Sequence, residues 1–334
     1  SAPYRMKYAI LSSTVYGANY VPALQAEDSP IRLGGIVSRG SERSVQMARA
    51  LGVPHSTSLS EVSDKQADVV IVAVSGDAGV SLSKEALRRG FDVLAEHPWE
   101  PEHVSELTAL AQETGRAFHI NGHWADQENA LAFIHGCHAA AQSSSAVFAN
   151  LITNPRTLYS GLDLLHRAIG ATDLDSFVRI DPITDNPPFV LMQGVAGSTQ
   201  VTIQYQTYTS LVDDGTAALA NHHFVIGYPH GHLTLAETSS PALWVPDMTQ
   251  LYTAGSQGQA QPSATFFPQD TAPTVGAFNH EHRVAANRFA LERILGHAAT
   301  GDCPPEQSAE HHQSVANTWR RLMNLGGEIS YVGG

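Results

Sequence analysis

Two histidines stand directly after apolar, strand-like runs, where a side chain can reach a bound ligand. His97 follows the run Asp92–Ala95, and His123 follows the run Ala117–Ile120. Imidazole gives or accepts a proton near neutral pH, because its ordinary pKa is about 6.5. We therefore predict that His97 or His123 donates a proton to a substrate, with Glu96 placed to orient an imidazole. The alternative is a structural role, since a chain with 17 histidines has one near any cleft by chance.

Asp163 is a third catalytic candidate. The run Leu158–Ile169 has helical spacing and places Tyr159 one turn before Asp163. The carboxylate can hold a substrate nitrogen or a water molecule, or it can complete a buried hydrogen-bond network. The sequence leaves both roles open.

No metal site is expected. Zinc needs three or four convergent ligands in a defined geometry. The histidine pairs His222–His223 and His230–His232 come without a cysteine or carboxylate pattern, and Cys137 and Cys303 lie far apart in the chain.

A small-residue turn joins the first predicted strand, Tyr8–Leu11, to a predicted helix, Ala18–Ala26, as in dinucleotide-binding folds. Of the glycines in the pattern G-x-G-x-x-G only Gly17 remains, and Ser13 stands in the place of the first. A left-handed backbone at Ser13 costs about 1–2 kcal/mol. The alternative is an ordinary strand–helix turn. The residues predicted to contact a cofactor here are Ser12, Ser13, Thr14, Val15, Tyr16 and Gly17.

The end of the second predicted strand, Arg32–Val37, carries two arginines and three serines in place of the acidic residue that binds a ribose 2′-hydroxyl. Guanidinium groups and hydroxyls suit a 2′-phosphate, so this segment predicts NADPH over NADH. The alternative is that the arginines are solvated surface charges. The predicted contacts are Ser38, Arg39, Gly40, Ser41, Arg43 and Ser44, together with residues at later strand ends, namely Val74, Ser75, Glu96, His97 and Asn121.

The elements that position these residues alternate along the first 120 residues. Strand-like runs such as Asp68–Val74 are followed by helical stretches such as Ser41–Leu51, Ser81–Arg89 and Pro101–Thr114. This pattern predicts a parallel α/β sheet whose carboxyl edge holds the ligand.

The pattern of apolar and polar residues changes after residue 122. Residues 125–141 are predicted as one long helix, and the segment 177–251 is rich in alternating strands, which indicates a mostly antiparallel sheet. An irregular loop is expected over 254–274, then helices over 281–295 and 310–325. We therefore predict an α/β protein with a Rossmann domain over 1–122 and a substrate-binding α/β domain over 123–334, whose last helices can pack back on the first domain.

Composition excludes several classes. A net charge of −13 argues against a nucleic-acid or anionic-membrane partner. No run of 18 apolar residues, no signal peptide, no G-x-S-x-G and no P-loop is present. The expectation is a cytoplasmic protein.

Five segments together resemble the thiazolinyl imine reductases of the glucose-fructose oxidoreductase-like (Gfo/Idh/MocA) superfamily. They are Arg32–Ser44, Val93–Pro98, Ile120–Trp124, Tyr159–Leu165 and Gly227–Leu235. The resemblance implies a Rossmann domain followed by a domain with a large open sheet. It also implies NADPH and a thiazoline, tethered to a nonribosomal-peptide carrier domain, as the substrate. Trp124, Tyr159 and Trp99 are then candidates to line the substrate site.

The sequence departs from its relatives at four places. The superfamily usually has Glu-Lys-Pro where this chain has Glu96-His97-Pro98, and often a histidine where this chain has Ser160, three residues before Asp163. Both groups serve sugar oxidation, so a sugar dehydrogenase is disfavoured. The imine reductases keep a glycine at Ser13 and tend to have a tyrosine at Trp124.

Three hypotheses follow. The first is an NADPH-dependent reductase of a carrier-bound thiazoline. The second is a degenerate relative without redox activity that binds or tailors a carrier-bound intermediate, which Ser13 and Trp124 motivate. The third is a reductase of another small imine or carbonyl. The open sheet allows a homodimer, and a monomer is equally allowed.

Overall fold

The computed structural model describes residues 5–211, 217–247, 265–267 and 275–332. Within these ranges, no helix is both long enough and apolar enough to cross a membrane. The chain forms two compact units. The first comprises Ser1–His123 and Arg283–Gln313, and the second comprises Trp124–His282 and Ser314–Gly334. The second unit is therefore not the continuous 123–334 segment, because Arg283–Gln313 belongs to the first.

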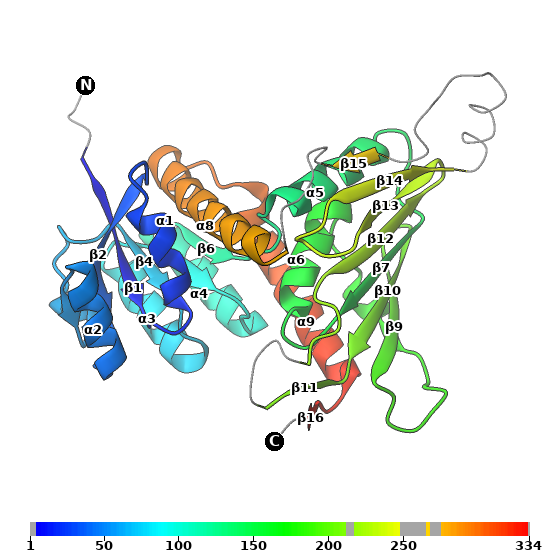
Figure 1. The fold of residues 1–334 in the computed structure, drawn as a ribbon, viewed down its shortest axis with the longest axis horizontal. Helices are drawn as coiled ribbons and strands as arrows, with labels where there is room; N and C mark the ends of the chain where they lie inside the picture. Colours follow the sequence, from blue (N-terminus) through cyan, green and yellow to red (C-terminus); the bar gives the residue numbers. More distant parts are fainter. Residues whose placement is uncertain (1–4, 212–216, 248–264, 268–274, 333–334) are drawn as a thin grey trace. The chain divides into compact units, whose positions relative to one another are not determined.

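The first unit is built on a six-stranded parallel sheet with the order β3-β2-β1-β4-β5-β6 (Figure 1). Its strands are β1 (Lys7–Ser12), β2 (Ile31–Val37), β3 (His55–Ser56), β4 (Val69–Val72), β5 (Asp92–Glu96) and β6 (Phe118–Asn121). Its helices are α1 (Val21–Gln25), α2 (Glu42–Leu51), α3 (Gly76–Arg88), α4 (Pro101–Thr114) and most of α8 (Val275–Thr300), with 3-10 turns η1 (Gly17–Tyr20), η2 (Leu59–Glu61) and η4 (Pro305–Gln307). This Rossmann arrangement confirms the predicted fold class.

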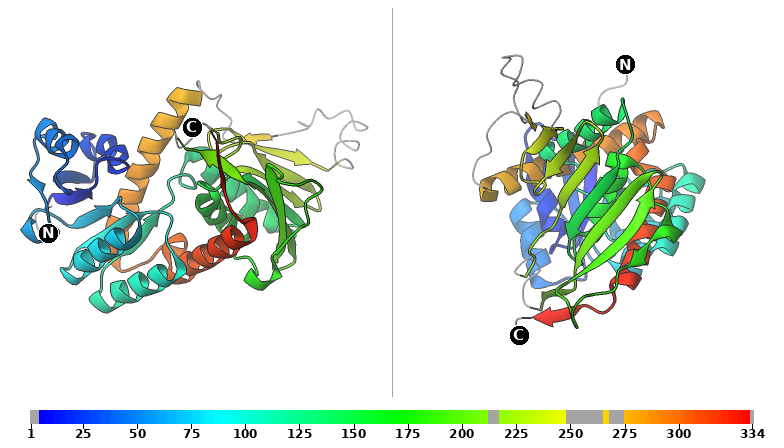
Figure 2. Two further views of the ribbon diagram at one scale, coloured as in Figure 1. Left: turned by 90° about the horizontal axis from the view of Figure 1, so that it is seen from below. Right: turned by 90° about the vertical axis from the view of Figure 1, so that its right-hand side faces the viewer.

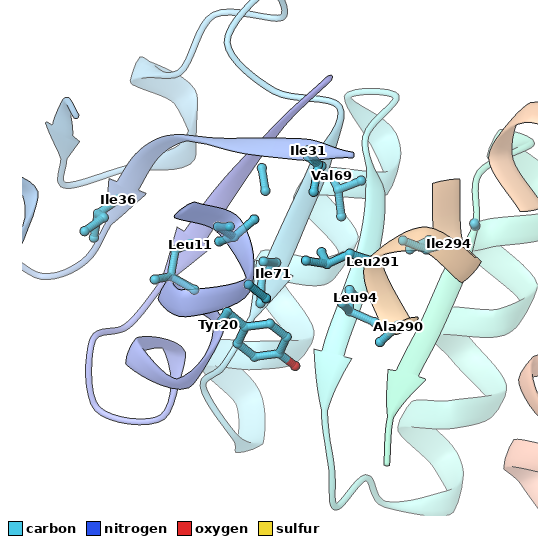
Figure 3. Packing of buried hydrophobic residues seen from close by; sticks show 14 of the residues in the cluster. Leu11, Tyr20, Ile31, Ile36, Val69, Ile71, Leu94, Ala290, Leu291 and Ile294 are labelled. Atoms are coloured by element: carbon cyan, nitrogen blue, oxygen red, sulfur yellow. The ribbon is translucent and has the colours of Figure 1, made fainter. Parts of the chain in front are cut away.

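One face of this sheet buries a continuous apolar cluster. Leu11, Ile71 and Leu94 of three neighbouring strands pack with Tyr20 and with Leu291 of α8 (Figure 3). All five side chains are at most 1% exposed. Burying a side chain of this size stabilises the fold by roughly 1.5–3 kcal/mol. The cluster thus fixes α1 and α8 on the sheet beside the carboxyl ends of β1, β4 and β5.

Local signals explain where the helices of this unit begin and end. The Ser41 side chain caps α2 by accepting the backbone N–H of Ser44, and Gly52 ends the helix in the left-handed conformation. Pro101 opens α4, and Gly115 closes it in the same way as Gly52.

Several helix boundaries differ from the sequence-based prediction, among them the end of α8, which lies at Thr300 and not at residue 295. The helix expected over 18–26 is a 3-10 turn followed by the short α1, because Pro22 has no N–H to continue the preceding turn. The helix α3 starts at Gly76, five residues earlier than expected. The helix α5 (Glu128–Ala141) starts three residues later than expected, because Gln127 is still extended.

The second unit carries an eight-stranded sheet with the order β15-β14-β13-β12-β7-β10-β9-β8. All its strand pairs are antiparallel except β7 with β10, which confirms the predicted mostly antiparallel sheet. Its strands are β7 (Phe148–Thr153), β8 (Val178–Arg179), β9 (Phe189–Ala196), β10 (Thr199–Gln206), β12 (His223–Tyr228), β13 (Gly231–Leu235), β14 (Ala242–Pro246) and β15 (Thr265–Phe267). A separate pair is formed by β11 (Tyr208–Ser210) and β16 (Ser330–Val332).

Helices α5, α6 (Leu158–Ile169) and α9 (Ala309–Gly326, which enters this unit at Ser314) lie on one face of the eight-stranded sheet. In the right-hand view of Figure 2, which looks onto this sheet, these helices lie behind it. One further 3-10 turn, η3 (Leu174–Ser176), precedes β8. Of the irregular loop expected over 254–274, only Thr265–Phe267 lies within the described residues, and it forms β15.

The segment Gly227–Leu235 forms the β12–β13 hairpin. A Cβ atom on Gly227 would lie 2.1 Å from the ring of Phe148 on the paired strand β7. Glycine is therefore required there for close packing of the two strands.

Candidate active site

The turn after β1 has the backbone of a nucleotide-binding loop, although its sequence pattern is poor. Ser13 adopts a left-handed conformation with φ of 64°, and its N–H donates to the Val37 carbonyl oxygen at 3.2 Å. A Cβ on Gly17 would lie 2.9 Å from Leu11 Cδ1 and 3.1 Å from the Ser12 carbonyl oxygen. The retained glycine thus allows a close approach of backbone to strand, and Ser13 bears the strain that a glycine would avoid.

Two hydroxyls of this turn form hydrogen bonds within the protein. The Ser12 hydroxyl donates to the Ile71 carbonyl oxygen at 2.8 Å and accepts the N–H of Ala73 at 2.9 Å. Thr14 Oγ1 lies 2.7 Å from Ser44 Oγ, which in turn accepts from the Ser41 hydroxyl at 2.9 Å. Ser12 therefore ties β1 to β4, and the chain from Ser41 to Thr14 ties together the two turns predicted to bind phosphate. These hydroxyls shape the two loops, and their contact with a cofactor stays a prediction.

Arg39 and Arg43 are exposed on the loop and first turn that follow β2. Neither forms an ion pair with any residue that the structure describes. Between them Gly40 has a φ of 90°, and the Ser38 hydroxyl is bound to His55 Nε2 at 2.8 Å. Two uncompensated guanidinium groups beside a capped helix start are suited to a phosphate.

The remaining predicted cofactor contacts differ in their exposure. Val74 is partly buried, and Ser75 is the exposed N-cap residue of α3, followed by Gly76 with a φ of 66°. The exposed residues Val15 and Tyr16 lie in the turn after β1.

The carboxyl ends of β5 and β6 carry a buried polar network. Glu96 and Asn121 are paired in register. The Tyr20 hydroxyl donates to Glu96 Oε1, and Asn121 Nδ2 donates to the Tyr20 hydroxyl at 2.6 Å and to Asn287 Oδ1 at 3.0 Å. Asn287 Nδ2 donates to the Asn19 carbonyl oxygen at 3.1 Å, so that α8 is held to the η1 turn.

Burial raises the pKa of Glu96 to about 7, against its ordinary value of 4.5. The Tyr20 hydrogen bond, the charge of Arg283 and the Asn121 amide oppose this rise without cancelling it. The Glu96 carboxyl is therefore close to half-protonated at neutral pH, which is the range in which a group can give and recover a proton.

His97 and His123 are neighbours. Their rings stack with centroids 6.5 Å apart and an interplanar angle of 22°, and both side chains are partly buried. His97 is joined to Pro98 by a cis peptide bond and directly follows Glu96. The structure thus brings together the two histidines that the sequence offered as rival proton donors.

Asp163 in the second unit is tied to an arginine. Both carboxylate oxygens of Asp163 contact Arg167, Oδ1 at 3.0 Å and Oδ2 at 2.9 Å, and Arg167 Nη1 contacts Asp126 Oδ1 at 2.7 Å. All three residues are buried or nearly so. Of the two roles left open by the sequence, the buried network is the one that the structure displays. Because both carboxylate oxygens contact Arg167, the geometry gives no support to Asp163 as the proton donor.

The aromatic residues predicted to line the substrate site have different surroundings. Trp99 is 3% exposed and packs edge-on against Phe118 in the core of the first unit, which gives no support to a lining role. Tyr159 is buried against Trp319, and burial together with the charge of Asp163 raises the pKa of its hydroxyl. Trp124 is partly exposed.

A further histidine escaped the sequence-based assignment of catalytic residues. His222 Nε2 lies 2.7 Å from the hydroxyl of Ser160, and its ring lies 5.0 Å from the ring of Trp124. The side chain of His222 is fully buried. An imidazole from the start of β12 thus contacts the serine that replaces the superfamily histidine.

Comparison with known proteins assigns both units. Residues 6–122 match the family model described as the Gfo/Idh/MocA oxidoreductase family with an NAD-binding Rossmann fold. Residues 144–245 match the model described as thiazolinyl imine reductase Irp3-like, C-terminal. The chain belongs to the Gfo/Idh/MocA oxidoreductases, with an Irp3-like C-terminal domain of the thiazolinyl imine reductase type. It is accordingly an NAD(P)-dependent oxidoreductase, which disfavours the degenerate relative without redox activity.

Solved structures of other family members show the same fold. The UDP-N-acetylglucosamine 3-dehydrogenase GnnA from Acidithiobacillus ferrooxidans is 14% identical with a TM-score of 0.68, over 96% of this chain and 97% of that one. The 3-ketoreductase KijD10 from Actinomadura kijaniata is 13% identical with a TM-score of 0.67, over 99% and 100%. An oxidoreductase from Agrobacterium radiobacter, solved with NAD+, is 10% identical with a TM-score of 0.70, over 97% and 96%. No curated protein matches the chain.

The nicotinamide cofactor of this family fits the residues present. The left-handed turn at Ser13, the close approach at Gly17 and the unpaired guanidinium groups of Arg39 and Arg43 suit its phosphates. Asn121 Oδ1 is a buried acceptor with no hydrogen-bond partner among the described residues, at the strand edge where such cofactors bind.

Proposed function

We propose that this reductase uses NADPH to reduce the C=N bond of a thiazoline ring to a thiazolidine, while the ring is tethered to a nonribosomal-peptide carrier domain. One observation carries the proposal. The second unit matches the thiazolinyl imine reductases over residues 144–245, whereas the lysine and histidine of sugar oxidation are replaced by His97 and Ser160. Since NADPH and such carriers belong to cytoplasmic biosynthesis, we place the protein in the cytoplasm.

Arg39 and Arg43 are proposed to select NADPH. An exposed guanidinium that forms no ion pair with any described residue can contact the 2′-phosphate without first breaking such a pair. When bound, the cofactor supplies a hydride for the ring carbon. Ser13, Thr14 and Gly17 shape the turn that faces its diphosphate.

The ring nitrogen must gain one proton for each hydride that the ring carbon gains. His97 is proposed to deliver it, because it follows β5 directly and an imidazole is half-protonated near neutral pH. His123, stacked beside it, and Glu96, with its pKa of about 7, are the groups from which His97 can be reprotonated. Neither Asp163 nor Tyr159 fits this role, the first being ion-paired and the second having a raised pKa.

The test is NADPH oxidation by the purified protein with a thiazoline loaded on a carrier domain, followed by mass analysis of the product. The product should gain two mass units, and His97→Ala and His97→Gln should lower kcat by about 100-fold or more at saturating NADPH. Because His97 is also a predicted cofactor contact, the NADPH affinity of each variant is measured separately by fluorescence titration. His135→Gln, which alters an exposed histidine on α5, is the matched control and should retain full activity.

Three outcomes would overturn parts of the proposal. Turnover without loss in the His97 variants removes His97 as the proton donor. Equal turnover of small imines or ketones free of any carrier favours the broader alternative of another small-imine or carbonyl reductase. No turnover of any imine by protein that binds NADPH refutes the proposed reaction.

A further inference from the structure

Three side chains with metal-binding atoms converge in the first unit, away from the residues discussed so far. They are His119 on β6, His297 near the end of α8, and Cys303 in the loop after α8. One ligand atom from each lies within 4.8 Å of the others. His119 Nε2 and His297 Nδ1 are 2.8 Å apart, and their rings stack with centroids 5.1 Å apart.

No sequence pattern marks this cluster, because His119 and His297 are separated by 178 positions. Only the fold brings them together: α8 packs on the sheet through Ala290, Leu291 and Ile294, and carries His297 to the side chain of His119. The cluster depends on no residue of the proposed reaction.

We propose that His119, His297 and Cys303 form a binding site for a transition-metal ion of the zinc class. Two imidazoles and one thiolate are the ligand types that zinc prefers, and a fourth position is left to water. The class is set by the sulfur and nitrogen donors, since magnesium and calcium require oxygen ligands.

The burial of the three residues suits such a site. His119 is fully buried, His297 is partly buried and Cys303 is exposed, so an ion can enter from the side of the cysteine. Nδ1 of His119 has no hydrogen-bond partner among the described residues, so it can carry the ring proton while Nε2 ligates the ion.

Binding requires small and specific changes. The two imidazole nitrogens now share one hydrogen bond, and tetrahedral coordination at about 2.0–2.1 Å from each would move them about half an ångström apart. The shared proton moves to the other nitrogen of its own ring. The thiol, which now contacts the Pro304 carbonyl oxygen at 3.5 Å, loses its proton to solvent. One proton is therefore released for each ion bound.

The consequence is a cross-link between β6 and the end of α8. A metal that binds the folded unit but not the unfolded chain raises its stability in proportion to its concentration above Kd. The link would supplement the Asn121–Asn287 hydrogen bond, which also joins β6 to α8.

The experiment uses the untagged full chain, freed of metal by a chelator and titrated with Zn²⁺ in competition with a chromophoric chelator. We expect one ion per chain, a rise in Tm on binding, and, with Co²⁺ as the probe, a thiolate-to-cobalt charge-transfer band. Cys303→Ser and His297→Gln should each weaken Zn²⁺ binding by at least about tenfold, since loss even of a group that only orients a ligand costs that much. Cys303→Ser should also abolish the charge-transfer band.

Cys137→Ala, which alters the other thiol of the chain, is the matched control and should bind Zn²⁺ as the native protein does. Retained NADPH binding and an unchanged circular dichroism spectrum would show that each variant is folded. Zn²⁺ affinity equal in the native protein, Cys303→Ser and His297→Gln would overturn the proposal, as would the absence of binding at micromolar Zn²⁺. Because the readouts are metal affinity and Tm, these results do not depend on the imine reductase activity.

Discussion

Replacing Glu96 by glutamine should change how the stability of the first unit depends on pH. The Glu96 carboxyl accepts the hydrogen bond of Tyr20, which is fully buried, at the end of β5, and a glutamine side-chain oxygen can accept the same bond. Burial raises the pKa of the carboxyl from 4.5 to about 7. The variant therefore keeps the packing and removes the titration.

The sign follows from proton linkage. The folded state binds this proton more tightly than the unfolded state, so the contribution to stability is complete below a pH of about 4.5. This contribution to stability falls as the pH rises and becomes constant above a pH of about 7. With these two values, the native protein loses about 2–3 kcal/mol between pH 5 and pH 8 relative to a side chain that does not titrate. For a unit of this size, that corresponds to a change in Tm of about 5–10 °C.

Calorimetry of both proteins without nucleotide, at pH 5 and at pH 8, measures this difference. Glu96→Gln should be close to the native protein at pH 5 and clearly more stable at pH 8. Glu102→Gln, on the exposed side of α4, is the matched control and should track the native protein at both pH values. A difference in Tm between Glu96→Gln and the native protein that is the same at both pH values would refute the reasoning.

Three further outcomes follow from the same geometry. Ser13→Gly should be about 0.5–1 kcal/mol more stable than Ser13→Ala in thermal unfolding, because glycine relieves the left-handed backbone but has more freedom when unfolded; equal stability would contradict this. Arg39→Ala should weaken NADPH binding by about tenfold or more and leave NADH binding unchanged, whereas Arg49→Ala at the far end of α2 should alter neither in a fluorescence titration. Arg167→Met should lower the free energy of unfolding by about 3–5 kcal/mol, because it leaves the carboxylates of Asp126 and Asp163 buried without a counter-ion. A loss below about 1 kcal/mol in chemical denaturation would show that water solvates these carboxylates in the variant.

The sequence predicts the first unit well because its signals are local. The buried run at β4, the serine cap and the closing glycines of α2 and α4 each act within a few residues. The position of His97 at the end of β5 follows from the same pattern. The alternation of β9 and β10 likewise reveals a sheet with one packed face.

What the sequence could not predict depends on contacts between distant segments. Tyr20 and Asn287 join Glu96 and Asn121 across 76 to 166 positions, and neither carries a motif that marks it. The same holds for Asp126, which shares Arg167 with Asp163 across 41 positions. For Trp99, an aromatic residue just after a strand end can face either a ligand or the core, and no local signal separates the two.

The proposed reaction gives a common physical reason for the two replaced superfamily positions, His97 and Ser160. Oxidation of a sugar hydroxyl removes a proton, so it requires an unprotonated base. Reduction of an imine consumes a proton, so it requires an acid that is reprotonated after each turnover. In the proposed reaction His97 is this acid, with His123 stacked beside it and with Glu96, whose pKa is about 7, as the preceding residue of the chain. The proton source then lies within the first unit, next to the strand ends that hold the cofactor. In this proposal the second unit recognises the ring and its tether. Ser160 and Trp124 can then pack against His222, because the proposed reaction takes no proton from them.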